Sequence, residues 1–169
     1  MVRVLYAMRL LLIIKLLVLL SVANGAPVLA KKICSNQLSL PVDGGFKFVD
    51  GHPLFGRSKT IRGVLVSVAS ATLGAPLLGL DIRLGALVGA VAMAGDLFSS
   101  FAKRRLNLPP SSRATGVDQI PESLFPLLAC RYWLSLTLLE ILIGVTAFLV
   151  GEILLSRVFY RLGVRDQPY

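Results

Sequence analysis

Long apolar segments alternate with shorter polar ones along the chain. A helix crosses the hydrocarbon core of a bilayer with about 20 consecutive apolar residues, and the apolar segments are close to that length. The last one, 123–160, is too long for one helix and fits two, with a tight turn near residues 136–138. The pattern predicts an all-α integral membrane protein with about five transmembrane helices, at 4–25, 61–80, 84–101, 121–136 and 138–160.

Two polar loops separate these helices, at about 31–60 and 103–120. Only 16% of the 169 residues are charged, whereas about a quarter of the residues of a soluble domain are charged. The helices leave no room for a second folded unit, so we expect residues 1–169 to form one membrane domain. Gly85 and Gly89 in the third helix allow close helix approach, and we expect them to pack within the protein.

The net charge of +9 fits nucleic-acid binding, a topology signal or a phosphate-bearing substrate. Nucleic acid requires a broad basic face, which the short polar segments cannot provide, so we expect no nucleic-acid partner. The cations instead flank the predicted helices: Lys31, Lys32, Lys47, Arg57, Lys59, Arg62, Lys103, Arg104, Arg105, Arg113, Arg157, Arg161 and Arg165. Because cytoplasmic loops are enriched in Lys and Arg, we expect a multi-pass cell-membrane protein with both loops and the C-terminus in the cytoplasm and the N-terminus outside.

The first apolar segment has a second interpretation, as a signal peptide. Arg3 and Arg9 precede an apolar run that ends in small residues at 23–26, which is the order found in such peptides. Lys15 interrupts the run, which favours a retained transmembrane helix. In that helix Lys15 and Arg9 must snorkel, face the other helices or touch lipid headgroups.

Candidate chemistry begins at the end of the third predicted helix. Asp96, a serine at 99 or 100, and Lys103 recur at helical spacing and share one face. Asp96 offers the oxygen ligands that Mg²⁺ prefers, and Lys103 with the adjacent Arg104 can bind phosphate oxygens. The alternative is a structural Asp–Lys pair followed by topology signals.

The first polar loop combines turns with cations. Asp43-Gly44-Gly45 and Asp50-Gly51 favour turns in which the backbone can approach a ligand. Lys59 and Arg62 lie near the start of the second helix, where free N–H groups favour anions. The loop lacks the glycine spacing of a P-loop, and we expect His52 to be a turn or hydrogen-bonding residue.

A third polar block ends the second loop. Asp118 precedes Pro121, which suits the first position of the fourth helix. Asp118 is either a turn or capping residue or a second metal ligand beside Asp96. Two carboxylates at the same ends of adjacent helices, with cations around them, favour the metal interpretation.

At these residues the chain resembles the archaeal CDP-archaeol synthase family, a branch of the membrane cytidylyltransferases that includes bacterial CDP-diacylglycerol synthase. The resemblance extends from about Ala23 to the C-terminus, in the same order. The matching motifs are Pro-Val-Asp-Gly-Gly at 41–45, Asp-Gly at 50–51, Gly-x-x-Lys-Thr-x-Arg-Gly at 56–63, Gly-Asp-x-x-x-Ser-Phe-x-Lys-Arg-Arg at 95–105, Asp-Gln-Ile-Pro at 118–121 and Tyr-Arg-Leu-Gly-Val-Arg-Asp-Gln-Pro at 160–168.

The resemblance implies Mg²⁺-dependent transfer of a cytidylyl group from CTP to a lipid phosphate, giving a CDP-lipid and pyrophosphate. It implies catalytic roles for Asp96, Lys103 and Asp118, with Asp96 and Asp118 as metal ligands. It also implies that CTP and the lipid phosphate are bound by Asp43, Gly44, Gly45, Asp50, Gly51, Lys59, Thr60, Arg62, Ser100 and Arg104. The sequence departs from the family at Glu122-Ser123, where a more apolar continuation is expected.

This departure affects the expected identity of the lipid substrate more than the expected type of reaction. The substrate implied by the resemblance is 2,3-bis-O-geranylgeranylglycerol 1-phosphate, and phosphatidic acid is the alternative. A different class of function, a small transporter or scaffold that binds lipid headgroups through its basic loops, does not require the paired carboxylates or the glycine turns. The sequence leaves open the oligomeric state, the number of metal ions and the choice between CTP and dCTP.

Overall fold

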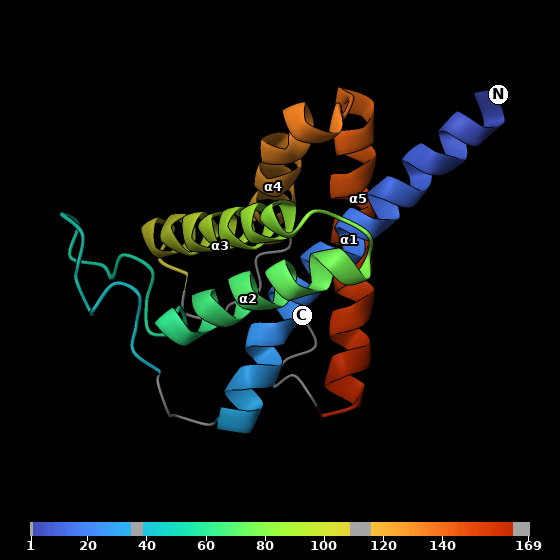
Figure 1. Ribbon diagram of the computed structural model, residues 1–169. Helices are drawn as coiled ribbons and strands as arrows, with labels where there is room; N and C mark the ends of the chain where they lie inside the picture. The colour runs from blue at the N-terminus through green and yellow to red at the C-terminus, as the bar shows by residue number, and fades with distance from the viewer. Residues whose placement is uncertain (1, 35–38, 109–115, 164–169) are drawn as a thin grey trace.

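The computed structural model describes residues 2–34, 39–108 and 116–163, and these contain five helices and no strand (Figure 1). Two isolated β-bridges, between Pro41 and Thr60 and between Lys47 and Pro53, fold the first loop back on itself. The all-α prediction is confirmed for this part of the chain. The helices are α1 (Val2–Cys34), α2 (Ile61–Leu77), α3 (Ile82–Arg105), α4 (Gln119–Leu134) and α5 (Leu138–Arg161).

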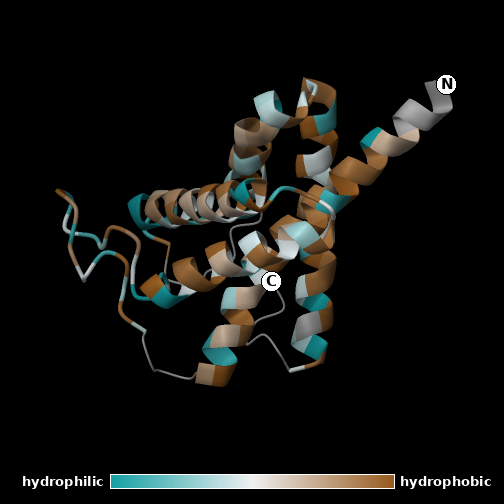
Figure 2. Ribbon diagram, viewed as in Figure 1, coloured by the Kyte–Doolittle hydropathy of each residue, from teal (hydrophilic) through white to brown (hydrophobic). Residues whose placement is uncertain are grey.

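The helix lengths support a membrane protein, while the count of five spans stays a prediction. Among the described residues, α1, α3 and α5 are long and apolar enough to cross a bilayer. The 17 residues of α2 and the 16 of α4 are fewer than a perpendicular crossing needs. Figure 2 shows hydrophobic residues along the helices and hydrophilic ones mainly near the helix ends and in the 39–60 loop.

Two helices extend beyond their predicted ends. The first continues past Gly25 to Cys34 and the third past Phe101 to Arg105, so both predicted loops begin as helix. Both extensions carry basic residues in their last turn, and these residues are good helix formers and interact favourably with the negative end of the helix dipole. Hydropathy alone therefore places these ends too early.

Local capping sets where the other helices begin. Thr60 caps α2 by accepting a hydrogen bond from the Gly63 N–H at 3.2 Å. Thr137 and Glu140 form a capping box at the start of α5, and Ser135 before it adopts a left-handed conformation with φ of 51°. The turn predicted near residues 136–138 is therefore confirmed.

Two contacts of α1 define the ends of the bundle. Arg9 donates to the carbonyls of Leu134 (3.3 Å) and Ser135 (3.0 Å), and lies 3.8 Å from Glu140. At the other end Lys32 donates to the Gly163 carbonyl. Accordingly α1 and α5 run parallel, and the α4–α5 turn lies at the opposite end from the 39–60 loop (Figure 1). Arg9 is thus held by a helix terminus at the end away from that loop.

Small residues let α3 pack closely against its neighbours. A Cβ on Gly85 would lie 2.6 Å from the Ala75 Cβ, and one on Gly89 would lie 2.9 Å from the Val68 Cα. A Cβ on Gly95 would lie 2.6 Å from the carbonyl carbon of Pro121 and 2.9 Å from the Glu122 nitrogen. The predicted internal packing of the small residues is confirmed for Gly85 and Gly89.

Replacement of Gly95 by alanine should destabilise the bundle, because its Cβ would meet backbone rather than a movable side chain. Overpacking of this kind costs about 1–3 kcal/mol, so the thermal midpoint in detergent should fall. Gly151→Ala is the control: nothing lies within 4 Å of its Cβ position in α5, and alanine is favoured over glycine in a helix by about 0.5–1 kcal/mol. Equal midpoints for the two variants would contradict the close α3–α4 contact.

Candidate active site

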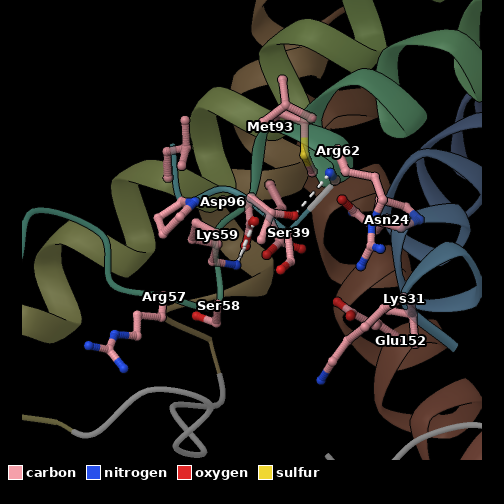
Figure 3. Close-up of a pocket in the computed structure, with 18 residues that line it drawn as sticks. Asn24, Lys31, Ser39, Arg57, Ser58, Lys59, Arg62, Met93, Asp96 and Glu152 are labelled. Carbon is pink, nitrogen blue, oxygen red and sulfur yellow. Dashed lines mark hydrogen bonds and ion pairs between the residues drawn. The ribbon is translucent and has the colours of Figure 1, made fainter. Parts of the chain in front are cut away.

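A cavity of about 600 Å³ lies where the 39–60 loop meets the helices (Figure 3). All five helices and the loop contribute to its wall. Among its lining residues are four cations and three carboxylates: Lys31, Arg57, Lys59, Arg62, Asp96, Glu122 and Glu152. Ionisable groups at membrane depth are costly and mark functional sites by default, so this cavity is the candidate site.

An ion pair between the loop and α3 lies on the cavity wall. The Lys59 ammonium is 2.5 and 2.6 Å from the two oxygens of Asp96, and the side chains are only 22% and 16% exposed. Burial acts to lower the pKa of Lys59, but the Asp96 carboxylate outweighs it and raises that pKa above its ordinary value. The lysine therefore carries its charge into the cavity at neutral pH.

A second ion pair lies nearer the C-terminal end of α3. Lys103 is 2.7 Å from Asp118, and both Lys103 and the neighbouring Ser100 are buried. The predicted face of Asp96, serine and Lys103 exists, but its carboxylate and ammonium each bind a partner from another element. Asp96 and Asp118, predicted to hold one metal together, are each neutralised by a different lysine, and only Asp96 lines the cavity.

Arg104 lies beneath the loop. Its side chain is buried and donates to the Leu108 carbonyl at 2.6 Å. Its Nε has no hydrogen-bond partner in the described segments and is 3.9 Å from the Cβ position of Gly56, whose φ is +91°. That distance is an ordinary van der Waals contact, so it is the left-handed backbone at Gly56 that favours glycine here.

Asp43 holds the loop together rather than lining the cavity. It is 6% exposed and accepts hydrogen bonds from the backbone N–H groups of Gly45 (3.0 Å), Phe55 (3.0 Å) and Gly56 (2.9 Å). Burial acts to raise its pKa, but these three N–H donors stabilise the carboxylate and lower the pKa below 3.8. Gly44 and Gly45, with φ of +54° and +84°, form the turn that Asp43 closes.

Asp50 fixes the tip of the loop to the end of α3. It lies 2.8 Å from Arg105 and accepts from the His52 N–H at 3.0 Å, beside the turn residue Gly51 (φ +80°). The Arg105 guanidinium is 4.8 Å from the Phe48 ring centre and 4.7 Å from that of Phe101. The aspartates and glycines of the loop are thus placed to shape it, whereas Lys59, Thr60 and Arg62 line the cavity.

Sequence reasoning did not assign seven polar residues of the cavity wall to the site: three are Ser39, Arg57 and Ser58 in the loop, and four lie on helices. Of these four, two are Glu122 on α4 and Glu152 on α5, and two are Asn24 and Lys31 on α1. Glu152 lies within an apolar run, where an ionisable residue is itself a functional signal. Asn24 and Glu122 were visible as polar residues next to apolar ones, but nothing in the sequence brings them near Asp96.

The carboxylates of the wall suit a metal that arrives with its substrate. The described part of the chain has no group of three or more His, Cys, Asp or Glu residues placed to hold a metal ion. Mg²⁺ usually binds one or two carboxylates together with substrate phosphates and waters. Asp96 with Glu122, which lies against it, provides such a set.

Comparison with known proteins gives one consistent result. The family model described as CarS-like CDP-archaeol synthase matches residues 7–169. A relative named CDP-archaeol synthase from Sulfurisphaera tokodaii is 36% identical over 154 residues, covering 88% of this chain and 89% of its own. Relatives with the same name from Pyrobaculum calidifontis and Staphylothermus marinus are 33% and 32% identical, each over 88% of this chain, covering 91% and 86% of their own lengths.

A solved structure agrees with the sequence relatives. It is described as an intramembrane enzyme for archaeal membrane lipid biosynthesis and superimposes with a TM-score of 0.73. The similarity covers 85% of this chain and 91% of that one, at 28% identity. The two chains therefore share a fold over most of their lengths.

Asp43→Asn should loosen the loop. The amide replaces one accepting oxygen with an NH₂ group, which cannot accept a hydrogen bond from the backbone N–H groups that face it. Leaving a buried donor unsatisfied costs about 1–3 kcal/mol, which corresponds to roughly 5- to 150-fold faster amide hydrogen exchange at Gly45, Phe55 and Gly56. Asp81→Asn alters only the hydrogen bond that the Arg83 N–H donates to the Asp81 side chain, and it should leave these amides unchanged. Unaltered exchange in the Asp43 variant would show that the carboxylate does not hold the loop.

The wild-type loop should also respond to acid in a defined window. Since the folded pKa of Asp43 is below 3.8, its carboxylate stabilises the loop at any pH above that value. This contribution is lost as the pH falls through the lowered folded pKa. The same three amides should therefore stay protected at pH 4.5, after correction for intrinsic exchange.

Proposed function

The chain belongs to the CDP-archaeol synthase family, and we propose that the cavity around Lys59 and Asp96 is where it transfers CMP from CTP to a lipid phosphate. The activity of the family is that of a CTP-dependent cytidylyltransferase that forms CDP-archaeol in membrane lipid biosynthesis. The observation that carries the location is the buried Lys59–Asp96 pair, which brings an ammonium and a carboxylate together in a cavity bordered by apolar helices.

The reaction needs little covalent chemistry from the protein. An oxygen of the lipid phosphate attacks the α-phosphorus of CTP, the new P–O bond forms, and the bond to the β-phosphate oxygen breaks to release pyrophosphate. Such transfers are accelerated by positioning and charge neutralisation. We assign the nucleotide phosphates to Lys59 and Arg62 at the start of α2, with Lys103 and Arg104 beneath the loop.

Phosphate binding at the start of α2 has a second physical basis. Arg62 lies in the first turn of α2, where backbone N–H groups without helical partners favour an anion. Lys59 lies two residues before the helix and can turn its flexible side chain from Asp96 to a phosphate oxygen. The Asp43-braced loop carries Lys59 and α2 carries Arg62, and both cations line the cavity.

Asp96 is the residue we assign to Mg²⁺, with a second carboxylate from Asp118 or Glu122. A bound Mg²⁺ would neutralise phosphate charge and orient the reacting groups. Asp118 is the partner that the sequence predicts. Glu122 is supported by its position on the cavity wall, next to Asp96.

We place the cavity at the cytoplasmic side, with the N-terminus outside and all five helices crossing the membrane. The basic residues at the loop end of the bundle support this orientation. The helices also expose many large apolar side chains, such as Leu65 (64% exposed), Leu73 (68%) and Leu142 (64%), which suits contact with lipid. The lipid substrate we propose is 2,3-bis-O-geranylgeranylglycerol 1-phosphate.

Transfer of labelled CMP tests this function directly. Protein in detergent micelles, supplied with labelled CTP, Mg²⁺ and the geranylgeranyl lipid phosphate, should give a labelled lipid. Asp96→Asn should reduce the rate at least about 100-fold, the scale at which loss of one charge-stabilising group acts. Lys47→Ala, an exposed change in the same loop, is the control and should retain the wild-type rate. Wild-type activity in the Asp96 variant would remove Asp96 from the site.

Magnesium titration separates the two possible partners of Asp96. The variant that lacks the true second carboxylate should need an Mg²⁺ concentration at least about tenfold higher than the wild-type protein for half-maximal rate. Loss of a group that binds or orients a metal ligand lowers metal affinity on that scale. Asp118→Asn and Glu122→Gln are the matched pair, because each replaces a carboxyl group with an amide of the same shape. If both variants keep the wild-type Mg²⁺ requirement, neither carboxylate holds the metal.

A further inference from the structure

One face of α1 lines the cavity and has no role in the nucleotide and metal assignments above. Asn24, Pro27, Val28 and Lys31 contribute to the wall, and their spacing of three, four and seven residues places them on one side of the helix. The face carries a neutral amide, two apolar side chains and a cation. It faces the Lys59–Asp96 pair from across the cavity (Figure 3).

The Asn24 amide is the unusual group on this face. Its Nδ2 is buried and has no hydrogen-bond partner within the described residues. Most buried polar groups are hydrogen-bonded, so an exception calls for an explanation. Ser21, one turn earlier, shows the common solution, because its hydroxyl donates to the Leu17 carbonyl at 2.9 Å. The Asn24 Nδ2 is therefore a donor to which no described residue offers an acceptor.

The position of Asn24 along α1 indicates which part of a lipid it can reach. It lies seven residues before Lys31, about 10 Å farther from the loop end of the bundle. A phosphate near Lys31 and Arg62, which both line the cavity, would place the attached glycerol one step deeper, beside Asn24. The apolar Pro27, Val28 and Met93 form wall between these polar groups.

We propose that Asn24 donates a hydrogen bond to a glycerol ether oxygen of the lipid substrate and so recognises the glycerol diether unit. This inference rests on the proposed function of the cavity. A neutral N–H donor suits an uncharged ether oxygen, whereas the phosphate is matched by the cations. Because Nδ2 is covered by its neighbours, the amide must rotate about χ2 to present it, and this torsion has a broad range.

A pair of lipids that differ only at the ether oxygens isolates this contact. The analogue carries methylene groups in place of both ether oxygens. The wild-type protein should show a KM about tenfold lower for the diether lipid phosphate than for this analogue. The reason is that a hydrogen-bond donor in the site is left unpaired by a ligand that lacks the acceptor. Asn24→Ala should bind the two lipids equally. Its KM for CTP should stay within about twofold of the wild-type value.

Two further variants make the outcome decisive. Asn24→Leu, close in size and apolar, gives the same comparison if the alanine variant does not fold. Ser21→Ala is the matched control on the same helix and should keep the wild-type preference. If the preference for the ether lipid persists in the Asn24 variants, or if their KM for CTP rises equally, the inference is wrong. If the wild-type protein transfers CMP to neither lipid, the proposed function itself fails.

Discussion

The cost of placing charge at membrane depth governs the arrangement of this protein. Lys59 and Asp96 are 37 residues apart in sequence, yet their side chains meet at 2.5 Å and exclude most solvent. Removing one partner of such a pair costs about 3–5 kcal/mol, whereas an apolar replacement of both is often neutral or stabilising. The pair is therefore poorly explained by stability alone. Under the proposed function, the pair holds opposite charges ready for ligands that carry charge of their own.

Close helix packing turns that pair into a cavity. Gly95 precedes Asp96. Because Gly95 has no side chain, the backbone of Pro121 and Glu122 occupies the place that its Cβ would take. The contact therefore sets a second carboxylate beside the first. On the loop side, Asp43 gathers three backbone N–H groups, and Arg105 lies near two aromatic rings. Both devices position Lys59 through the backbone rather than by touching it.

Hydropathy was sufficient to predict the helices and the 135–137 turn, because each depends on local sequence. It was insufficient for the ends of α1 and α3, where lysine and arginine continue the helix into predicted loops. Residue chemistry identified Lys59, Arg62 and Asp96, all on the cavity wall. It did not pair Asp96 with Lys59, or Lys103 with Asp118, because those contacts join segments distant in the chain. Glu152 was hidden by its apolar neighbours, although that setting is what makes a carboxylate informative.

The two walls of the cavity match the two sides of a phosphoryl-type transfer. An in-line displacement needs the attacking and leaving oxygens on opposite faces of the phosphorus. Lys59 and Arg62 extend from the loop and α2, while Asn24 and Lys31 extend from α1. A membrane enzyme that joins a water-soluble nucleotide to a lipid must receive its substrates from two phases. A cavity shared by a polar loop and an apolar helix face meets this requirement without a large domain movement, because each substrate can approach the wall that suits its own chemistry.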